Sequence, residues 1–392
     1  MLIVKKFGGT SVGDQERIMN VARRCAEEYS KGNDVVVVLS AMGKTTDILL
    51  KTAREINPKA PKRELDMLMA IALDSLGIPA VSLNAFQVRM ETTSVYGNAR
   101  LKKIDKERIL HELASRKIVI VTGFQGVNRY EDYTTLGRGG SDTTAVALAA
   151  ALHADACEIY TDVDGVFTAD PRIVPGARKL SEITYDEMLD LATCGAGVLH
   201  NRSVEMAKKY GVPLVVRSSL NNSEGTIVKE VTSVERMLIS GVALDENAAR
   251  ISVMGLKDEP GIAFKLFNLL AKNNVNVDII LQSIGREKTK DISFTVNEED
   301  VENAIRIIEE NKERLTFHEV TSNLDVAKVS IVGAGMTSNP GVAAKMFEAL
   351  YNVGININMI STSEIRITVL VKKKDGEKAM NAIHEAFFGN VD

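Results

Sequence analysis

The chain begins with the stretch Leu2-Ile-Val-Lys-Lys-Phe7-Gly8-Gly9-Thr10-Ser11, and this stretch decides the fold class of its first half. Its apolar, partly β-branched start predicts a short strand, and the two glycines predict a tight turn. Residues 14–29 then repeat apolar side chains at helical spacing, among them Ile18, Val21 and Cys25. A strand, a glycine turn and a helix in this order are typical of an α/β fold.

Three further runs indicate strands that are buried on both faces, because each is rich in apolar and β-branched residues. These runs are Val35–Leu39, Ile118–Thr122 and Cys157–Thr161. Helical segments separate them, including Asp142–His153. Strands that alternate with helices predict a mostly parallel sheet with helices on both sides, so we expect an α/β domain.

The second half of the chain contains an internal repeat. Pro260-Gly-Ile-Ala-Phe-Lys-Leu-Phe267 returns as Pro340-Gly-Val-Ala-Ala-Lys-Met-Phe347, at an offset of 340 − 260 = 80 residues and without a gap. Each copy predicts a strand, a Pro-Gly turn, an amphipathic helix, two strands, a helix and a strand, which is the βαββαβ order of a ferredoxin-like unit. The strands that the pattern identifies are Ile251–Met254, Ile292–Val296, Lys328–Val332 and Ile365–Val371.

The repeat sets the expected domain organisation and leaves two interpretations of its role open. We expect one domain over residues 1–230, a linker over 231–245, and two small domains over 246–322 and 323–392. A unit this short leaves a sheet face or edge exposed, so two copies should pair with each other or across a dimer. The copies are either purely structural or bind an anionic group, because the Pro-Gly turn opens a helix N-terminus.

Composition disfavours several classes of function. The net charge of -4 provides no broad basic field, so we expect no nucleic-acid partner. No apolar run approaches the length of a membrane span or a signal peptide, so we expect no membrane partner and a cytoplasmic location. Three cysteines in 392 residues, none at metal-ligand spacing, indicate reduced thiols and argue against a structural zinc site.

Three segments carry candidate chemistry. Lys6 precedes the Gly8-Gly9 turn, where backbone amides and an ammonium suit phosphate. In Thr135-Leu-Gly-Arg-Gly-Gly-Ser-Asp-Thr-Thr144, glycines again precede a helix, and the arginine offers a fork for a carboxylate. The acidic and hydroxyl groups of residues 160–172 suit a nucleotide with Mg²⁺. Plainer interpretations remain open, namely an ordinary glycine turn, a capped helix with a solvated arginine, and an Asx-rich turn.

Together these segments resemble the aspartate kinases over nearly the whole chain. The motifs that carry the resemblance are Lys6-Phe-Gly-Gly-Thr-Ser-Val12, Val38-Leu-Ser-Ala-Met-Gly43 with Thr45-Thr-Asp47, Gly97-Asn-Ala-Arg100, Gly137-Arg-Gly-Gly-Ser-Asp142, Thr161-Asp-Val-Asp-Gly165 with Asp170-Pro-Arg172, and Gly195-Ala-Gly-Val-Leu-His200. The repeated unit resembles tandem ACT domains, the amino-acid-sensing modules of this family. The resemblance implies an amino-acid-kinase three-layer sandwich followed by two ACT domains. It further implies that the ATP γ-phosphoryl group passes to the side-chain carboxylate of L-aspartate, the first step toward lysine, threonine and methionine.

The resemblance also implies roles for individual residues. Lys6 would stabilise the transferring phosphoryl group, and Asp142 would hold that lysine. The nucleotide-binding set is Lys6, Gly8, Gly9, Ser11, Thr161, Asp162, Phe167, Asp170 and Arg172. The amino-acid-binding set is Ser40, Thr46, Arg138 and Ser141, with Arg138 on the α-carboxylate of aspartate. Because the acceptor carboxylate is already ionised at neutral pH, positioning and cationic stabilisation with ATP and Mg²⁺ should carry the catalysis without a general base.

One departure from the family pattern lies between Ala70 and Ile71. The family carries there a Gly-Glu step whose glutamate binds the substrate's α-ammonium, and about ten residues, or about three helical turns, are missing here. Either the sequence omits a stretch that the molecule contains, or the protein lacks it and its amino-acid site is damaged. The second case favours a catalytically impaired subunit that binds nucleotide and effector to regulate a partner. A kinase for another substrate, such as glutamate, is a third interpretation that the tandem sensor units oppose.

The repeats diverge in charge where an effector would bind. Asp278 and Gln282 correspond to Asn358 and Thr362 of the second copy, and only the aspartate can pair with an α-ammonium. By resemblance we expect lysine, or else threonine, to bind at an interface between sensor units and to inhibit. The effector-binding set is Asp278, Gln282, Met336, Thr337, Asn356 and Ile357. The resemblance also implies a homo-oligomer formed through the ACT domains.

Overall fold

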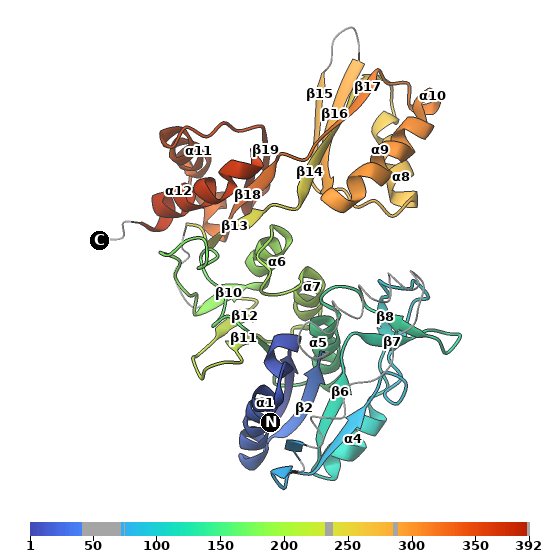
Figure 1. Ribbon diagram of the computed structural model, residues 1–392, viewed down its shortest axis with the longest axis vertical. Helices are drawn as coiled ribbons and strands as arrows, with labels where there is room; N and C mark the ends of the chain where they lie inside the picture. The colour runs from blue at the N-terminus through green and yellow to red at the C-terminus, as the bar shows by residue number, and fades with distance from the viewer. Residues whose placement is uncertain (41–71, 74, 232–237, 285–288, 390–392) are drawn as a thin grey trace. The chain divides into compact units, whose positions relative to one another are not determined.

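The computed structural model describes residues 1–40, 72–73, 75–231, 238–284 and 289–389. Thr46 and the junction between Ala70 and Ile71 therefore lie outside the described residues. The chain divides into two compact units, whose elements are labelled in Figure 1. The first unit comprises Met1–Phe167, Lys179–Thr193 and Gly197–Val234, and the second comprises Thr168–Arg178, Cys194–Ala196 and Glu235–Asp392.

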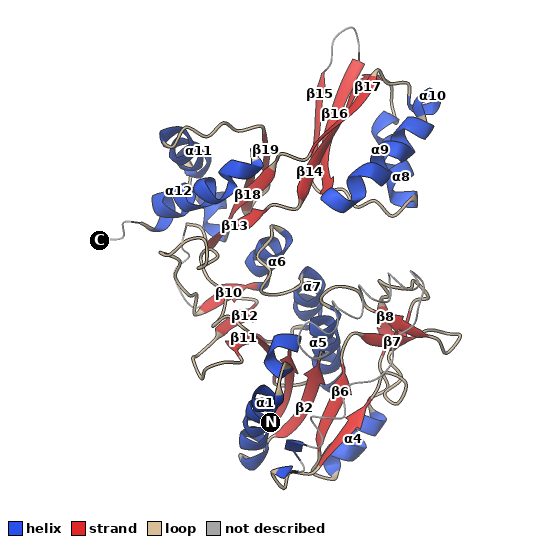
Figure 2. Ribbon diagram, viewed as in Figure 1, coloured by secondary structure: helices blue, strands red, loops and turns tan. Residues whose placement is uncertain are grey.

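An eight-stranded sheet in the order β10-β12-β11-β9-β1-β2-β6-β3 forms the centre of the first unit (Figure 2). Its strands are β1 (Leu2–Phe7), β2 (Asp34–Leu39), β3 (Ala80–Leu83), β6 (Ile118–Thr122), β9 (Ala156–Thr161), β10 (Glu182–Thr184), β11 (Leu214–Ser218) and β12 (Thr226–Lys229). Every neighbouring pair is parallel except β11 with β12. The predicted mostly parallel sheet is therefore confirmed.

Helices cover both faces of this sheet. They are α1 (Gln15–Ser30), α4 (Glu107–Ala114), α5 (Gly140–Leu152), α6 (Tyr185–Thr193) and α7 (Asn201–Tyr210), with the 3-10 turn η1 (Gly9–Val12) after β1. The Lys5 ammonium lies 3.9 Å from Glu28 on α1, whereas the Lys6 ammonium lies 2.6 Å from Asp142 on α5. Successive residues of a strand point to opposite sides, so α1 and α5 cover opposite faces.

A small second sheet of the first unit was not predicted from the sequence. It has the order β5-β4-β7-β8. Its strands are β4 (Glu91–Thr92), β5 (Leu101–Lys103), β7 (Gln125–Val127) and β8 (Tyr133–Thr135). Strands of two or three residues are too short to show an alternating pattern, so sequence periodicity could not identify them.

The first repeat folds in the predicted βαββαβ order around an antiparallel sheet, β15-β16-β14-β17. Its elements are β14 (Ala248–Lys257), α8 (Ile262–Lys272), β15 (Ile280–Ile284), β16 (Thr289–Asn297), η2 (Glu298–Asp300), α9 (Val301–Glu310), α10 (Lys312–Leu315) and β17 (Glu319–Asn323). Apolar residues of both helices and of the sheet form one buried core, which includes Leu266, Phe294 and Ile307.

The second repeat departs from the predicted order, because the fourth strand of its sheet comes from upstream. Its sheet is β13-β18-β20-β19. The elements are β13 (Gly241–Asp245), β18 (Ala327–Val332), η3 (Ala334–Ser338), α11 (Val342–Asn352), β19 (Met359–Thr362), β20 (Arg366–Val371), η4 (Lys373–Asp375) and α12 (Gly376–Phe388). β13 lies beside β18 at the edge that β17 occupies in the first repeat, so the segment expected as a linker contains a strand of this sheet. The first repeat is thus inserted between β13 and β18.

A buried lysine joins the two repeats. Lys328 on β18 is 7% exposed, and its ammonium lies 2.9 Å from Asp245 and 2.8 Å from Asp278. Burial alone would lower the pKa of Lys328, but the carboxylates of Asp278 and Asp245 outweigh burial and raise it. A small apolar cluster also spans the repeats, and it consists of Ile279, Val326, Met359 and Leu370.

The central strand β1 carries a second buried lysine. Lys5 is 2% exposed, and its Nζ donates a hydrogen bond to Glu158 Oε2 at 2.8 Å. Burial alone would lower the pKa of Lys5, but Tyr160 and Glu158 raise it. Glu158 also accepts a hydrogen bond from Arg217 at 3.1 Å. Glu158 is therefore the shared partner of the buried Lys5 and of Arg217.

Glu158→Leu should destabilise the first unit by about 3 kcal/mol, because it leaves the Lys5 ammonium buried without its main partner. Calorimetric unfolding measures the effect. Adding Lys5→Met to this variant should restore most of the lost stability. Asp186→Ala is the matched control, because its partner Lys208 is 40% exposed and such surface pairs contribute less than about 1 kcal/mol. Equal losses in the single and double variants would contradict this account.

Candidate active site

An ion pair at the carboxyl ends of the parallel strands defines the candidate site. Lys6 is the penultimate residue of β1, and its Nζ lies 2.6 Å from Asp142 Oδ1 in the first turn of α5. Both side chains are 12% exposed, so the pair is largely screened from water. Sites in open α/β sheets gather at this edge of the sheet. The structure thus brings together the two residues for which the sequence predicted a catalytic role.

The turn after β1 adds polar groups without partners. Gly8 precedes η1, and the Ser11 amide donates a hydrogen bond to the Gly8 carbonyl at 2.9 Å. Within the described residues, the buried Ser11 Oγ makes no hydrogen bond, and neither does Asp142 Oδ1 beyond its ion pair with Lys6. Buried polar atoms are normally satisfied, so the unpaired Ser11 hydroxyl beside a glycine turn and a lysine can donate a hydrogen bond to an anionic ligand.

Close backbone approaches bring the predicted amino-acid-binding residues to the same edge. A Cβ on Gly123, which follows β6, would lie 2.7 Å from Ser141 Oγ and 3.0 Å from the Leu39 carbonyl. Ser40 follows Leu39 directly, and its amide donates to the Phe7 carbonyl at the end of β1. Ser40 and Ser141 are therefore placed at the strand ends that carry Lys6.

Gly139 requires the left-handed backbone region that favours glycine, with φ of 68°. A Cβ at this position would lie 2.2 Å from Cγ of His200, so the imidazole packs directly on the glycine. Burial lowers the pKa of His200. Arg138, the preceding residue, is exposed. The tight packing fixes the backbone from which Arg138 projects.

Two residues near the site were missed in the sequence. His200 ends the Gly195–His200 motif, and Arg202 lies two residues beyond it. The Arg202 guanidinium donates to the carbonyls of Leu136 at 2.7 Å and Ala99 at 3.0 Å, and to Asn98 Oδ1 at 3.1 Å. It thereby joins α7 to two separate motif loops. The only signal in the sequence was the closeness of Arg202 to a glycine-rich motif.

The remaining predicted nucleotide-binding residues fall into two groups. Thr161 and Asp162 follow β9, and the Thr161 hydroxyl donates to Asp162 Oδ1 at 3.0 Å. Phe167 forms a β-bridge with Lys179. Asp170 and Arg172 belong to the second unit and form a two-contact ion pair, with Nη2 to Oδ2 at 2.6 Å. The hydrogen bond from Arg172 holds the pKa of Asp170 below its usual value.

The predicted effector residues are divided between the repeats. Asp278 is paired with Lys328, and the exposed Gln282 lies on the edge strand β15. Met336 lines a cavity of about 300 Å³ at the start of α11, together with Gly341 and Thr362. The other predicted members are placed near this sheet's helices and turns: Thr337 in η3, and Asn356 and Ile357 between α11 and β19. Neither Asn356 nor Ile357 lines the cavity.

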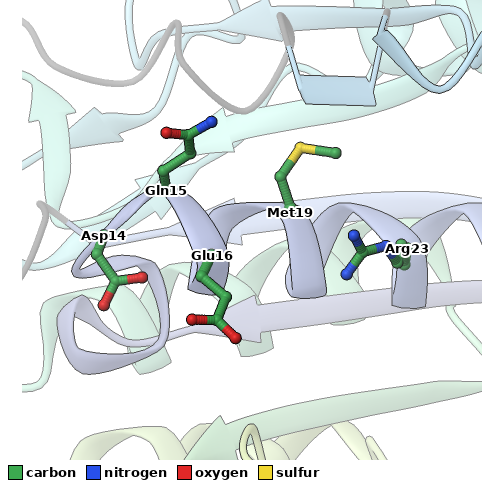
Figure 3. Close-up of a pocket in the computed structure, with 5 residues that line it drawn as sticks. All are labelled: Asp14, Gln15, Glu16, Met19 and Arg23. Atoms are coloured by element: carbon green, nitrogen blue, oxygen red, sulfur yellow. The ribbon is translucent and has the colours of Figure 1, made fainter.

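Another hollow, of about 460 Å³, lies on the first turns of α1 (Figure 3). Its lining side chains are Asp14, Gln15, Glu16, Met19 and Arg23, none of which belongs to a predicted binding set.

No group of three or more His, Cys, Asp or Glu side chains within the described ranges could hold a metal ion. In the same part of the chain, no helix combines the length and apolar character that a membrane crossing requires.

Comparison with known proteins tests the resemblance that the motifs indicated. The family model described as amino acid kinase family matches residues 1–218, and the ACT domain model matches 251–311 and 329–387. The chain is 52% identical to the aspartokinase of Bacillus sp. strain MGA3 over 398 aligned residues, which cover 98% of this chain and 97% of that protein. It is 50% identical to aspartokinase 2 of Bacillus subtilis, with the same coverage.

Solved structures agree with these relatives. E. coli aspartokinase III in complex with aspartate and ADP matches with a TM-score of 0.82 and 25% identity, covering 99% of this chain and all of the other. The same enzyme in complex with lysine and aspartate matches with a TM-score of 0.73 and 26% identity, covering 99% of each chain. The chain therefore belongs to the amino acid kinase family, as a member of the aspartokinases that carry C-terminal ACT domains.

Proposed function

We propose that this protein is an aspartate kinase, which transfers the γ-phosphoryl group of ATP to the side-chain carboxylate of L-aspartate and forms 4-phospho-L-aspartate and ADP. The observation that carries the assignment of the reacting groups is the Lys6–Asp142 ion pair beside the Gly8-Gly9 turn. Near-full-length relatives named aspartokinase support the activity itself.

The reaction brings two anions together while charge builds on the phosphoryl oxygens. A partly buried ammonium at this position stabilises that charge more strongly than it would in water. Asp142 holds the Lys6 ammonium at 2.6 Å, so little reorganisation is needed as the phosphoryl group moves. The acceptor carboxylate is ionised at neutral pH, and no base is required. Mg²⁺ enters with ATP as part of the substrate, because kinases hold this ion largely through the phosphates.

The amino-acid substrate is assigned to Ser40, Ser141 and Arg138, with Arg138 on the α-carboxylate. Thr46 is assigned to the same amino-acid substrate. Ser40 and Ser141 lie at the strand ends beside Lys6, and Arg138 projects from the backbone that Gly139 and His200 fix. The nucleotide is assigned to the glycine turn, Ser11, Thr161, Asp162 and Phe167, with Asp170 and Arg172.

The alignments show that the relatives contain residues that this chain lacks, without showing where along the chain these residues belong. The alignment with the Bacillus sp. aspartokinase spans 398 positions while covering 98% of the 392 residues of this chain, so it exceeds the aligned part of the chain by at least 398 − 392 = 6 positions. At least six positions of that relative therefore have no counterpart here. The relatives nevertheless favour the enzyme over the impaired regulatory subunit, because they are named as aspartokinases over nearly their whole length.

We further propose cytoplasmic homo-oligomers joined through the ACT domains. The edge strands of both sensor sheets expose apolar side chains, with Ile280 50% exposed, Leu281 40% and Ile360 40%. Unpaired edges of this kind are suited to pairing with a second copy. All three cysteines are buried, and none forms a disulfide within the part of the chain that the structure describes, which suits a reducing compartment.

Lys6→Ala should lower kcat by at least about 100-fold, because it removes the cation that meets the developing phosphoryl charge. A coupled assay for ADP release, run with L-aspartate and with L-glutamate, measures the effect and tests substrate choice together. The exposed Lys209→Ala is the control and should keep full activity. A Lys6→Ala enzyme with a third of the wild-type turnover would refute the role of Lys6. A wild-type protein that is inactive on aspartate would instead favour the interpretation as a catalytically impaired regulatory subunit.

Arg138→Lys should raise the KM for aspartate about tenfold while the KM for ATP changes less than about twofold, because an ammonium cannot reproduce two parallel hydrogen bonds to a carboxylate. Steady-state kinetics with each substrate varied in turn measures the difference. Arg129→Lys, on an exposed loop of the same unit, is the matched control. Equal effects on both KM values would remove Arg138 from the amino-acid site.

Asp278→Ala should raise the lysine concentration that halves the rate by about tenfold or more, because a charge-assisted hydrogen bond to the effector's α-ammonium is lost. The comparison uses each protein's own uninhibited rate. Asn358→Ala, at the matching place in the second repeat, should shift this concentration far less. Threonine is tested in parallel as the second candidate effector. Unchanged inhibition in Asp278→Ala would exclude this residue from the effector site.

A further inference from the structure

Two segments of the kinase portion belong to the second unit, Thr168–Arg178 and Cys194–Ala196, and the first of them is a loop of eleven residues. The loop Thr168–Arg178 leaves the first unit after Phe167 and returns at Lys179, and these two residues form a β-bridge. The Thr168 amide also donates to the Arg178 carbonyl at 2.9 Å, which closes the loop at its base. The loop is therefore a hairpin-like excursion whose body is packed with the C-terminal sensor domain.

Apolar side chains bury the loop in the core of that domain. Ala169 is 4% exposed and Val174 is 3% exposed, and both belong to one cluster with residues of β18, β20, α11 and α12. Ile173 and Ala177 pack against the same cluster. Loops normally run over a protein surface, so a loop that contributes to a neighbouring domain's core is held firmly.

Four hydrogen bonds fix the loop's polar groups to the same domain. Thr168 Oγ1 lies 2.9 Å from His384 Nε2 of α12, and the Thr168 carbonyl accepts from the Val242 amide of β13 at 2.8 Å. Asn381 Nδ2 of α12 donates to the Ile173 carbonyl at 3.1 Å. Arg178 Nη2 donates to the Phe388 carbonyl at 3.1 Å. These contacts hold the loop at its first residue, its middle and its last residue.

The ion pair assigned to the nucleotide lies between these anchors. Asp170 and Arg172 form their two-contact pair within a turn in which the Ile173 and Val174 amides both donate to the Asp170 carbonyl. Ala169 precedes Asp170, and Ile173 follows Arg172, so buried or anchored residues flank the pair on both sides. A shift of α12 or β13 therefore moves the pair.

We propose that α12 and β13 of the C-terminal sensor domain hold the nucleotide-binding loop in place, so that His384 and Asn381 are positioning residues for ATP. This inference rests on the proposed function, which assigns Asp170 and Arg172 to the nucleotide. The sensor domain then changes the affinity for the nucleotide through the contacts of α12 and β13 with this loop. The affinity for the amino-acid substrate does not change. β13 also carries Asp245, the partner of Lys328, so the strand that touches the loop is joined to Asp278 of the first repeat.

Kinetics of four variants test the inference. His384→Ala and Asn381→Ala should each raise the KM for ATP and the calorimetric Kd for ADP by about tenfold, the effect of one well-placed hydrogen bond. The KM for aspartate should change less than about twofold. His384→Gln retains a hydrogen-bonding group and should recover part of the nucleotide affinity. Glu377→Ala, at an exposed position of α12, is the matched control and should behave as the wild-type protein.

The outcomes separate this inference from the proposed function. Asp170→Asn tests the nucleotide role itself, and an unchanged KM for ATP in that variant would remove the role and the inference together. A second outcome is that Asp170→Asn raises the KM for ATP while the folded His384→Ala and Asn381→Ala proteins leave it unchanged. In that case the positioning role is wrong and the assignment of Asp170 to the nucleotide stands. A parallel rise of both KM values in the α12 variants would also overturn the inference, because it would indicate general disruption. Thermal unfolding of each variant identifies the folded proteins.

Discussion

Two consecutive lysines on one central strand must point to opposite faces of the sheet, and the first unit is organised around this constraint. Lys5 enters the α1 face, where Glu158 compensates its charge and the Tyr160 hydroxyl accepts a further hydrogen bond. Lys6 enters the α5 face, where Asp142 receives it. A slip of one residue that moved Lys6 to the α1 face would put Phe7 in its place on the α5 face and remove the cation from the site. Burial of Lys5 thus fixes the position of Lys6.

The strands β1, β2, β6 and β9 could be predicted because they are apolar and β-branched, whereas β3, β10, β11 and β12 of the same sheet were not identified. The ACT repeat could be predicted because its Pro-Gly turns recur at a fixed offset. Three features could not be predicted in this way. The strands of the small second sheet are too short for a period. β13 lies far upstream of the sheet that it completes, so no local pattern associates it with the second repeat. The contacts of Arg202 depend on loops about a hundred residues away, and a single sequence does not reveal such distances.

The sequence predicted the functional residues of the site more fully than the residues that hold them in position. Lys6 is chemically conspicuous, since a lysine beside a glycine turn at a helix start suits phosphate, whereas the role of Asp142 followed only from the resemblance to the aspartate kinases. The residues that hold them are not conspicuous. Gly123 and Gly139 act by leaving room for Ser141 and His200, and glycines of this kind cannot be told from ordinary turn glycines until the neighbours are known. The shape of this site therefore depends on glycines, which carry no functional group of their own.

The excursion of the loop Thr168–Arg178 into the C-terminal domain also sets an order of events during synthesis. Arg178 is bonded to the carbonyl of a residue 210 positions later in the chain. At about 5–20 residues per second, the ribosome reaches that partner about 10 to 40 seconds after it has made the loop. The sheet around Lys6 can form while translation continues, but the loop has no core to join until α12 has emerged. A chain that stops early therefore lacks the helix against which this loop is packed, and maturation of the catalytic half waits for the last helix of the sensor half.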